Sequence, residues 1–191
     1  MRVKLRLAAV SNMRTSPHIG MMTLVDDIEC RALVITCDNN VREQLSVRLD
    51  RGPSFSKKWL PEVMWRVLRD MGADQFEIQI NGLMAGEYLT DLVCTATGQR
   101  FPIRASDAIL LAYVANLPVY ADKTLMDRQS SPWKPNALSV AMPVNVIDGK
   151  VLRSLLDDAV RAENYELASK IRDELKSREK SERDDMIEPE I

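Results

Sequence analysis

The stretch from Phe101 to Tyr120, FPIRASDAILLAYVANLPVY, constrains the fold more than any other part of the chain. From about Ser106 to Asn116, apolar side chains point in every direction around the predicted helix axis, and a helix of this kind is buried. Asn116 tolerates the left-handed conformation of a helix end, and Pro118 cannot continue the helix. The stretch therefore predicts a buried helix followed by a short strand from Pro118 to Tyr120.

A charged corner opens this helix. Ser106 is predicted to be the N-cap, and Asp107 places a carboxylate in the first turn, where free amide groups and the helix dipole favour negative charge. Arg104 lies just before them, and its planar guanidinium suits phosphate. Two interpretations stay open, because spacing does not choose between them: a cap with an ion pair, or part of a phosphate-handling site.

The composition of the 191 residues is that of a globular protein with one ordinary domain and an appendage, since 46% of the residues are hydrophobic. No run approaches the roughly 18 apolar residues of a membrane span, and the basic N-terminus lacks the apolar core of a signal peptide. We therefore expect a cytoplasmic protein with no membrane partner. Three cysteines without CxxC spacing and a single histidine do not assemble a zinc site.

The net charge of −2 argues against a general nucleic-acid-binding protein, which would be strongly basic. The charge is unevenly distributed, because basic residues gather between positions 48 and 69 while the C-terminal end is acidic. Such a cluster is either a solvated face or a surface that follows a phosphate backbone. The candidates for nucleic-acid contact are Arg48, Arg51, Lys57, Lys58 and Arg66.

Hydrophobic periodicity predicts the remaining elements of a first domain over residues 1–129. Strands are expected at 3–10, 21–25, 30–37, 76–81, 87–95 and 99–104, with a loop at 11–19. Helical spacing predicts helices at 40–50 and 59–71, the first capped by Asn40 and the second burying Trp59 and Met64 in the core. Consecutive hairpins with interspersed helices predict an α+β fold, with helices packed on a mainly antiparallel sheet.

The C-terminal part reads as a separate unit. Prolines interrupt residues 130–148, which are expected to be a linker. Two apolar stripes within residues 149–180 predict an α-helical hairpin, and a charged tail over 181–191 is expected to be disordered. Because an isolated hairpin has too little core to be stable, we expect it to dock, dimerise or bind a protein partner.

The stretch from Phe101 to Tyr120 resembles the signature of the bifunctional nuclease family, in which a strand ending in Arg precedes a Ser-Asp-Ala-Ile helix start and a Pro-containing strand follows. The matching residues are Pro102, Arg104, Ser106, Asp107, Ala108, Ile109, Ala112, Pro118 and Tyr120. The resemblance extends from residue 3 to about residue 128. It implies an α+β fold, a dimer, and cleavage of DNA and RNA, with Arg104, Ser106 and Asp107 as candidate catalytic residues.

Cleavage of a phosphodiester needs an activated water, and the chain offers no unambiguous general base. A metal-bound water is then the more economical hypothesis, with Mg or Mn as candidate ions and Asp107 as a ligand. Arg104 would stabilise the charge on the phosphate.

Two segments depart from the family's pattern. In the family, an acidic residue usually opens the first helix. In this chain it is replaced in the region Asp38-Asn39-Asn40. The family's run with a His and an acid appears as Pro53–Trp59, which has neither. If those groups assist cleavage, this chain has lost them.

Residues Asn164 to Leu175 resemble the UVR motif of nucleotide-excision-repair proteins. That resemblance implies a helical hairpin used for protein contact. Two functions therefore stay open: a nuclease acting on DNA or RNA, and a catalytically inactive family member that acts as a dimeric interaction module through the hairpin.

Overall fold

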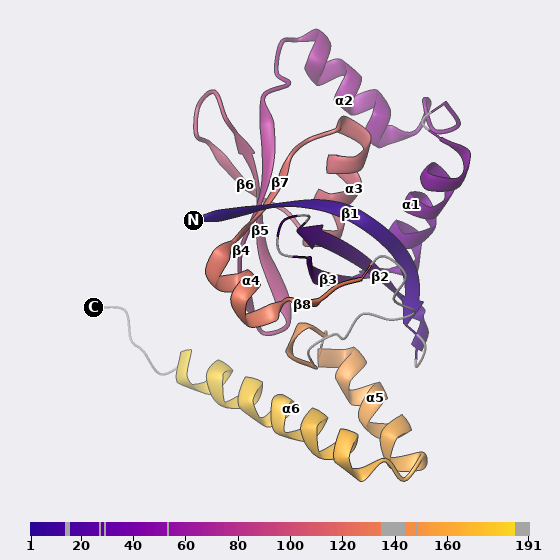
Figure 1. The fold of residues 1–191 in the computed structure, drawn as a ribbon, viewed down its shortest axis with the longest axis vertical. Coiled ribbons are helices and arrows are strands. Elements are labelled where there is room, and N and C mark those ends of the chain that lie inside the picture. The colour runs from indigo at the N-terminus through magenta and orange to yellow at the C-terminus, as the bar shows by residue number, and fades with distance from the viewer. Residues whose placement is uncertain are drawn as a thin grey trace. The chain divides into compact units, whose positions relative to one another are not determined.

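A computed structural model of the chain (Figure 1) describes residues 1–13, 16–26, 28, 30–52, 54–134, 144–147 and 149–185. The chain divides into two compact units. One comprises Met1–Met84 with Tyr88–Met142, and the other comprises Ala85–Glu87 with Pro143–Ile191. The first unit holds the sheet and the charged corner, and the second holds two C-terminal helices.

An eight-stranded sheet in the order β6-β5-β4-β7-β1-β2-β3-β8 organises the first unit. Antiparallel pairs form at β1–β2, β2–β3, β1–β7, β3–β8 and β5–β6, a parallel pair forms at β4–β7, and β4 and β5 are also neighbours. The predicted α+β class with a mainly antiparallel sheet is therefore confirmed. The strands are β1 (Arg2–Met13), β2 (Ser16–Asp26), β3 (Arg31–Asp38), β4 (Phe76–Met84), β5 (Glu87–Cys94), β6 (Arg100–Pro102), β7 (Val119–Asp122) and β8 (Ser131–Pro132).

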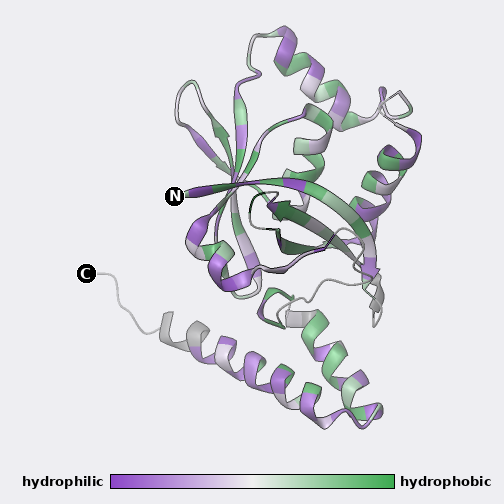
Figure 2. Ribbon diagram, in the orientation of Figure 1, coloured by the Kyte–Doolittle hydropathy of each residue, from purple (hydrophilic) through white to green (hydrophobic). Residues whose placement is uncertain are grey.

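Helices α1 (Asn39–Arg51), α2 (Leu60–Asp70), α3 (Ala105–Ala115) and α4 (Lys123–Gln129) accompany the sheet. The first three lie next to one another, with α3 in contact with both α1 and α2 (Figure 1). Strands β2 and β3 are the most hydrophobic part of the sheet (Figure 2), and they supply much of the core. Fully buried core side chains include Met22, Leu24, Leu33, Ile35, Ile78 and Ile80.

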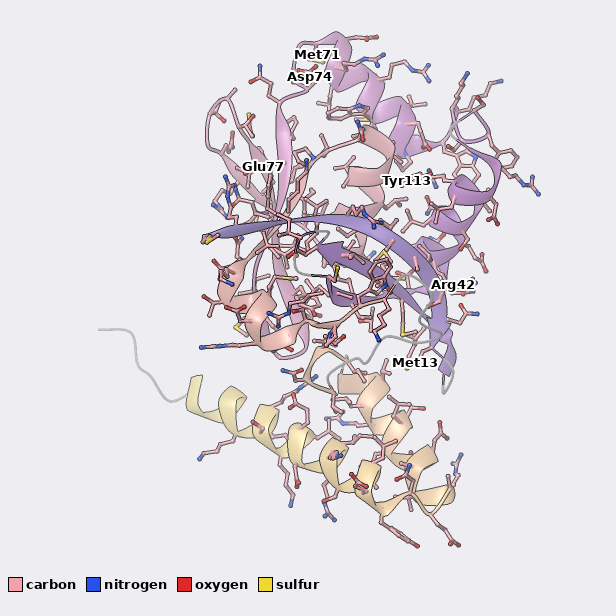
Figure 3. All side chains as sticks on the ribbon, viewed as in Figure 1. Met13, Arg42, Met71, Asp74, Glu77 and Tyr113 are labelled. Atoms are coloured by element: carbon pink, nitrogen blue, oxygen red, sulfur yellow. The ribbon has the colours of Figure 1, made fainter. Side chains whose placement is uncertain are left out.

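Helix α3 is the buried helix that its composition predicts. Ala108 and Ile109 are fully buried, and Asn116 ends the helix in the left-handed conformation with φ of 53°. The burial is not complete, because Tyr113 remains 36% exposed. Tyr113, which Figure 3 labels, donates its hydroxyl to the Arg48 carbonyl of α1 at 3.5 Å, and this bond links the two helices.

The first hairpin is longer than predicted. Ser11 pairs with Met21 and Asn12 pairs with Gly20, so the loop predicted at 11–19 is wrong. Polar side chains can face solvent while their backbone groups pair, so the polarity of this segment was a poor guide to its structure.

The apolar stripe of α2 is exposed rather than buried. Leu60, Val63, Met64, Val67 and Met71 are 37–76% exposed, and α2 has no buried residue. The prediction that Met64 lies in the core is therefore wrong. The helix contacts the rest of the unit through other side chains, including Trp65, whose ring meets Phe76 edge-on at 6.5 Å.

Two helices form the C-terminal hairpin, as predicted. α5 (Gly149–Arg161) packs against α6 (Tyr165–Asp185), and the chain turns at Glu163 with φ of 56°. Asn164 caps α6 by accepting from the Leu167 amide at 3.2 Å. A short 3-10 helix (Val144–Val146) precedes the hairpin, and α6 continues past residue 180.

Part of the predicted linker (135–143 and 148) and the end of the predicted tail (186–191) lie outside the described residues. Among the helices that the structure describes, none is long and apolar enough to cross a membrane.

Candidate active site

The charged corner lies where β6 leads into α3. Arg104 is the N-cap residue of α3, with φ of −59°, ψ of 136° and no side-chain cap hydrogen bond. Ser106 is therefore not the N-cap, and that prediction is wrong. Its side chain lies in the first turn and is 7% exposed, which argues against the catalytic role predicted for its hydroxyl.

Arg104 and Asp107 form a two-point ion pair. Arg104 Nε donates to Asp107 Oδ2 at 2.7 Å, and Arg104 Nη2 donates to Asp107 Oδ1 at 3.1 Å. The spacing of one helical turn brings the two side chains together. The pair is on the surface, with the Arg104 side chain 66% exposed and the Asp107 side chain 37% exposed, so solvent and ligands reach it.

Asp38 is the third member of this corner. It ends β3 and caps α1, because its Oδ1 accepts from the Val41 amide at 2.9 Å. Its Oδ2 lies 3.6 Å from Arg104 Nη1. The cap predicted at Asn40 is therefore wrong by two positions. The start of α1 does present an acidic group to Arg104, contrary to the expectation drawn from the family's pattern.

In the corner, the carboxylates of Asp38 and Asp107 share one positive charge, the Arg104 guanidinium. Hydrogen bonds and charge from Asp107, followed by the smaller effect of Asp38, raise the pKa of Arg104 above its ordinary value. The corner carries one more negative than positive charge. It can therefore accept a further cation, and Arg104 alone does not make it attractive to an anion.

The residues of the corner fit a weakly held divalent cation better than a dedicated metal cage. Among the residues that the structure describes, no three His, Cys, Asp or Glu side chains are grouped to hold a metal ion. Mg²⁺ is usually bound by one or two carboxylates together with waters and substrate phosphates. Asp38 and Asp107 meet that requirement, since both approach Arg104 and both are partly exposed.

A surface groove of about 670 Å³ adjoins the corner. Asp107 is part of its lining, and most of the other lining side chains are apolar. Helices α1 and α3 and the start of α2 supply the walls, which are Gln44, Trp59, Leu60, Pro61, Asp107, Leu110 and Leu111. Trp59 belongs to the segment that departs from the family's pattern, so that segment contributes a wall in place of a His or an acid.

Arg48 does not face solvent, which corrects its prediction as a nucleic-acid contact. Its side chain is 1% exposed and pairs with Glu62, with Nε to Oε1 at 2.7 Å and Nη2 to Oε2 at 2.8 Å. The guanidinium also lies 4.6 Å from the centre of the Trp59 ring. Arg48 therefore lies against Trp59, which is part of the groove wall.

The Glu62 carboxylate is stabilised in its charged form by this arrangement. Burial would raise the pKa of Glu62, but hydrogen bonds from Arg48 and Ser56 outweigh it and lower the pKa below its ordinary value of 4.5. The pair thus remains charged at neutral pH, and it ties α1 to α2.

The other predicted basic contacts are exposed. Arg51, Lys57, Lys58 and Arg66 all lie on the surface between the end of α1 and the middle of α2. Two of them are held locally: Arg51 lies over the Phe55 ring at 4.6 Å, and Arg66 Nη2 donates to the Lys57 carbonyl at 2.9 Å.

Comparison with known protein families identifies the domain that contains this corner. Residues 22–134, more than half of the chain, match the bifunctional nuclease domain. The chain belongs to the bifunctional nuclease domain family. The family predicted from the Phe101–Tyr120 stretch is thereby confirmed, and the match supports a nuclease-like interpretation. Residues 150–181 match the UvrB/uvrC motif, which covers all but the first residue of α5 and most of α6. A comparison with curated proteins found no match.

Proposed function

We propose that the bifunctional nuclease domain hydrolyses phosphodiester bonds of DNA, RNA or both at the corner formed by Asp38, Arg104 and Asp107. The observation that carries the proposal is the exposed two-point pair of Arg104 and Asp107, with a second carboxylate 3.6 Å from the same guanidinium. Arg104 presents a planar fork that fits phosphate oxygens, and Asp107 holds that fork in a fixed orientation.

Asp38 and Asp107 are the residues that would hold Mg²⁺ or Mn²⁺ in this mechanism. A bound divalent ion would lower the pKa of water and polarise the phosphate. When a phosphate enters, Arg104 would exchange its carboxylate partners for phosphate oxygens, which would leave Asp38 and Asp107 available to hold the ion. The excess negative charge of the corner favours this exchange, since a divalent cation neutralises the corner more completely than Arg104 does.

Exposed basic residues of the same unit would follow the phosphate backbone of the substrate. Arg51, Lys57, Lys58 and Arg66 supply four positive charges at the surface of the same unit. Contacts of this kind raise affinity without reading the base sequence, and salt weakens them.

We also propose that the domain dimerises through α2. The exposed stripe of Leu60, Met64, Val67 and Met71 has spacings of four, three and four residues, so it reads the same from either end. In an antiparallel pair of α2 helices, Leu60 would face Met71 of the second copy and Met64 would face its Val67. A two-fold interface requires this kind of self-complementarity.

An interaction function for the C-terminal hairpin is the second candidate. Its support is a groove of about 630 Å³ between α5 and α6, flanked by Val160 and Tyr165, which are 51% and 68% exposed. The groove also has polar and charged walls, so an amphipathic helical segment of another protein would suit it; these walls are Asp157, Arg161, Ser169 and Arg172. In the full chain, Tyr165→Glu should abolish co-purification of such a partner while Lys170→Glu, on the same helix, does not. A partner retained by Tyr165→Glu would contradict this assignment.

Cleavage by the purified full chain tests the nuclease proposal. We expect single-stranded and duplex DNA and RNA substrates to reveal activity that appears with Mg²⁺ or Mn²⁺ and disappears with EDTA. Absence of cleavage with both ions would exclude the nuclease function and leave the interaction function.

A further inference from the structure

The groove beside Asp107 has walls that phosphodiester cleavage does not require. Apart from Asp107 and Gln44, its lining is apolar: Trp59, Leu60, Pro61, Leu110 and Leu111. A phosphate gains nothing from contact with leucine and proline side chains, since such contact removes water from a charged group. The groove therefore suits an apolar or aromatic part of a ligand whose charged part lies at the corner.

Nucleobases have the shape and chemistry that such walls accept. Their flat faces stack on aromatic and apolar side chains with little regard to sequence, and one such contact strengthens binding about five- to a hundredfold. The groove volume of about 670 Å³ lies within the range of small-ligand sites. The Arg48 guanidinium lies 4.6 Å from the centre of the Trp59 ring, and the Phe55 ring meets it edge-on with 5.7 Å between ring centres. The aromatic wall is thus fixed in place.

Positive charges lie near two residues that line the groove. Arg104 pairs with the groove residue Asp107. The exposed Lys57 and Lys58 directly precede the groove residue Trp59 along the chain. A nucleotide within a strand has a phosphate on each side of its base, so this charge pattern matches a polynucleotide rather than an apolar peptide.

We infer that the groove receives an unpaired nucleobase of the strand whose phosphodiester lies at Arg104. This inference rests on the proposed nuclease function and makes single-stranded DNA or RNA its substrate class. A base in a duplex is stacked and paired, so it would have to be extruded before it could enter. Leu111 and Trp59 are then residues that determine which strands are bound.

Equilibrium binding separates this inference from cleavage. Fluorescently labelled ten-nucleotide single strands are compared with a strand of the same length whose bases are replaced by abasic sites, and with a ten-base-pair duplex. The measurements use calcium, which binds carboxylate and phosphate oxygens as magnesium does. We expect the base-bearing single strand to bind about tenfold more tightly than the other two. This comparison uses the unmodified chain and so does not depend on the folding of any variant.

Two matched variants assign the preference to the groove. Leu111→Gln places an amide in the wall and should remove most of the preference for the base-bearing strand. Leu89→Gln makes the same change at a 46% exposed position on β5, outside the groove, and should leave the preference intact.

Equal affinity for the base-bearing and abasic strands would overturn the inference while leaving the nuclease proposal standing. A preference that survives in Leu111→Gln would also overturn it, because the base would then lie elsewhere. Base-dependent binding without any cleavage in magnesium or manganese would support the groove assignment and exclude the nuclease function. Failure to bind any of the three ligands would overturn both.

Discussion

Arg104 donates hydrogen bonds to both carboxylate oxygens of Asp107, at 2.7 and 3.1 Å, and an Asp38 oxygen lies 3.6 Å from the same guanidinium. The residues come from two distant parts of the chain, the end of β3 and the start of α3. Arg104 therefore pairs with two carboxylates and still remains exposed to solvent. In the proposed mechanism, the guanidinium exchanges these partners for phosphate.

The planar fork of Arg104 should matter more than its charge. Arg104→Lys retains the positive charge but cannot bind two oxygens in one plane. We expect a fall of about a hundredfold in kcat for phosphodiester cleavage, as for the loss of a donor to transition-state charge. Steady-state kinetics on a single-stranded substrate would measure the effect. Unchanged kinetics in Arg104→Lys would mean that Arg104 provides charge alone.

The buried pair of Arg48 and Glu62 should be important for stability. Arg48→Ala leaves the Glu62 carboxylate without its partner in a site where the Arg48 side chain is 1% exposed. The expected loss in free energy of unfolding is about 3–5 kcal/mol, measured by urea denaturation. Arg51→Ala, on the exposed side of the same helix, should change stability by less than about 1 kcal/mol. Similar effects of the two substitutions would contradict the role given to Arg48.

The same pair predicts a pH dependence of stability. The pKa of Glu62 is lower in the folded protein than its ordinary value of 4.5. Its contribution is therefore complete above about pH 4.5 and is lost as the pH falls through the folded value. Glu62→Gln should be less stable than the unmodified protein at pH 7, and the difference should shrink below pH 4.5. Denaturation curves at pH 7, 5 and 3 would measure it, and a difference that stays constant would contradict the assignment.

The exposed face of α2 predicts a dimer that a polar substitution dissociates. Met64→Glu with Val67→Glu places charges at the centre of the two-fold stripe, so we expect a monomer by sedimentation velocity. Arg69→Glu, on the same helix outside the stripe, should leave the dimer intact. A dimer that persists in the double variant would place the interface elsewhere, and a monomeric unmodified chain would exclude dimerisation through α2.

The buried helix and its charged corner could be predicted from the sequence because the signal is local. Helix α3 is apolar on every side, and Arg104 and Asp107 are one turn apart. The succession of neighbouring strands β4, β5 and β6 is equally predictable from alternation and turn residues. In each case, neighbouring residues carry the pattern, and the folded chain preserves it.

Asp38 could not be predicted in the same way. Its contact with Arg104 depends on how β3 and α1 pack beside α3, and no spacing in the sequence encodes that distance. The predictions for Arg48 and for α2 are wrong for a related reason. A basic residue on a helix predicts exposure and an apolar stripe predicts burial, but here Glu62 and Trp59 enclose the arginine. The helix consequently turns its stripe to solvent.

The most direct test of the nuclease site compares two aspartates that are each paired with an arginine. Asp91 accepts from Arg100 at 3.0 Å on the strands β5 and β6, as Asp107 accepts from Arg104, but it lies outside the proposed site. Magnesium-dependent cleavage of a single-stranded substrate would be measured for Asp107→Asn and for Asp91→Asn. The proposed mechanism predicts at least a hundredfold lower rate in Asp107→Asn and an unchanged rate in Asp91→Asn. Equal rates in the two variants would show that the corner of Asp38, Arg104 and Asp107 does not perform the cleavage.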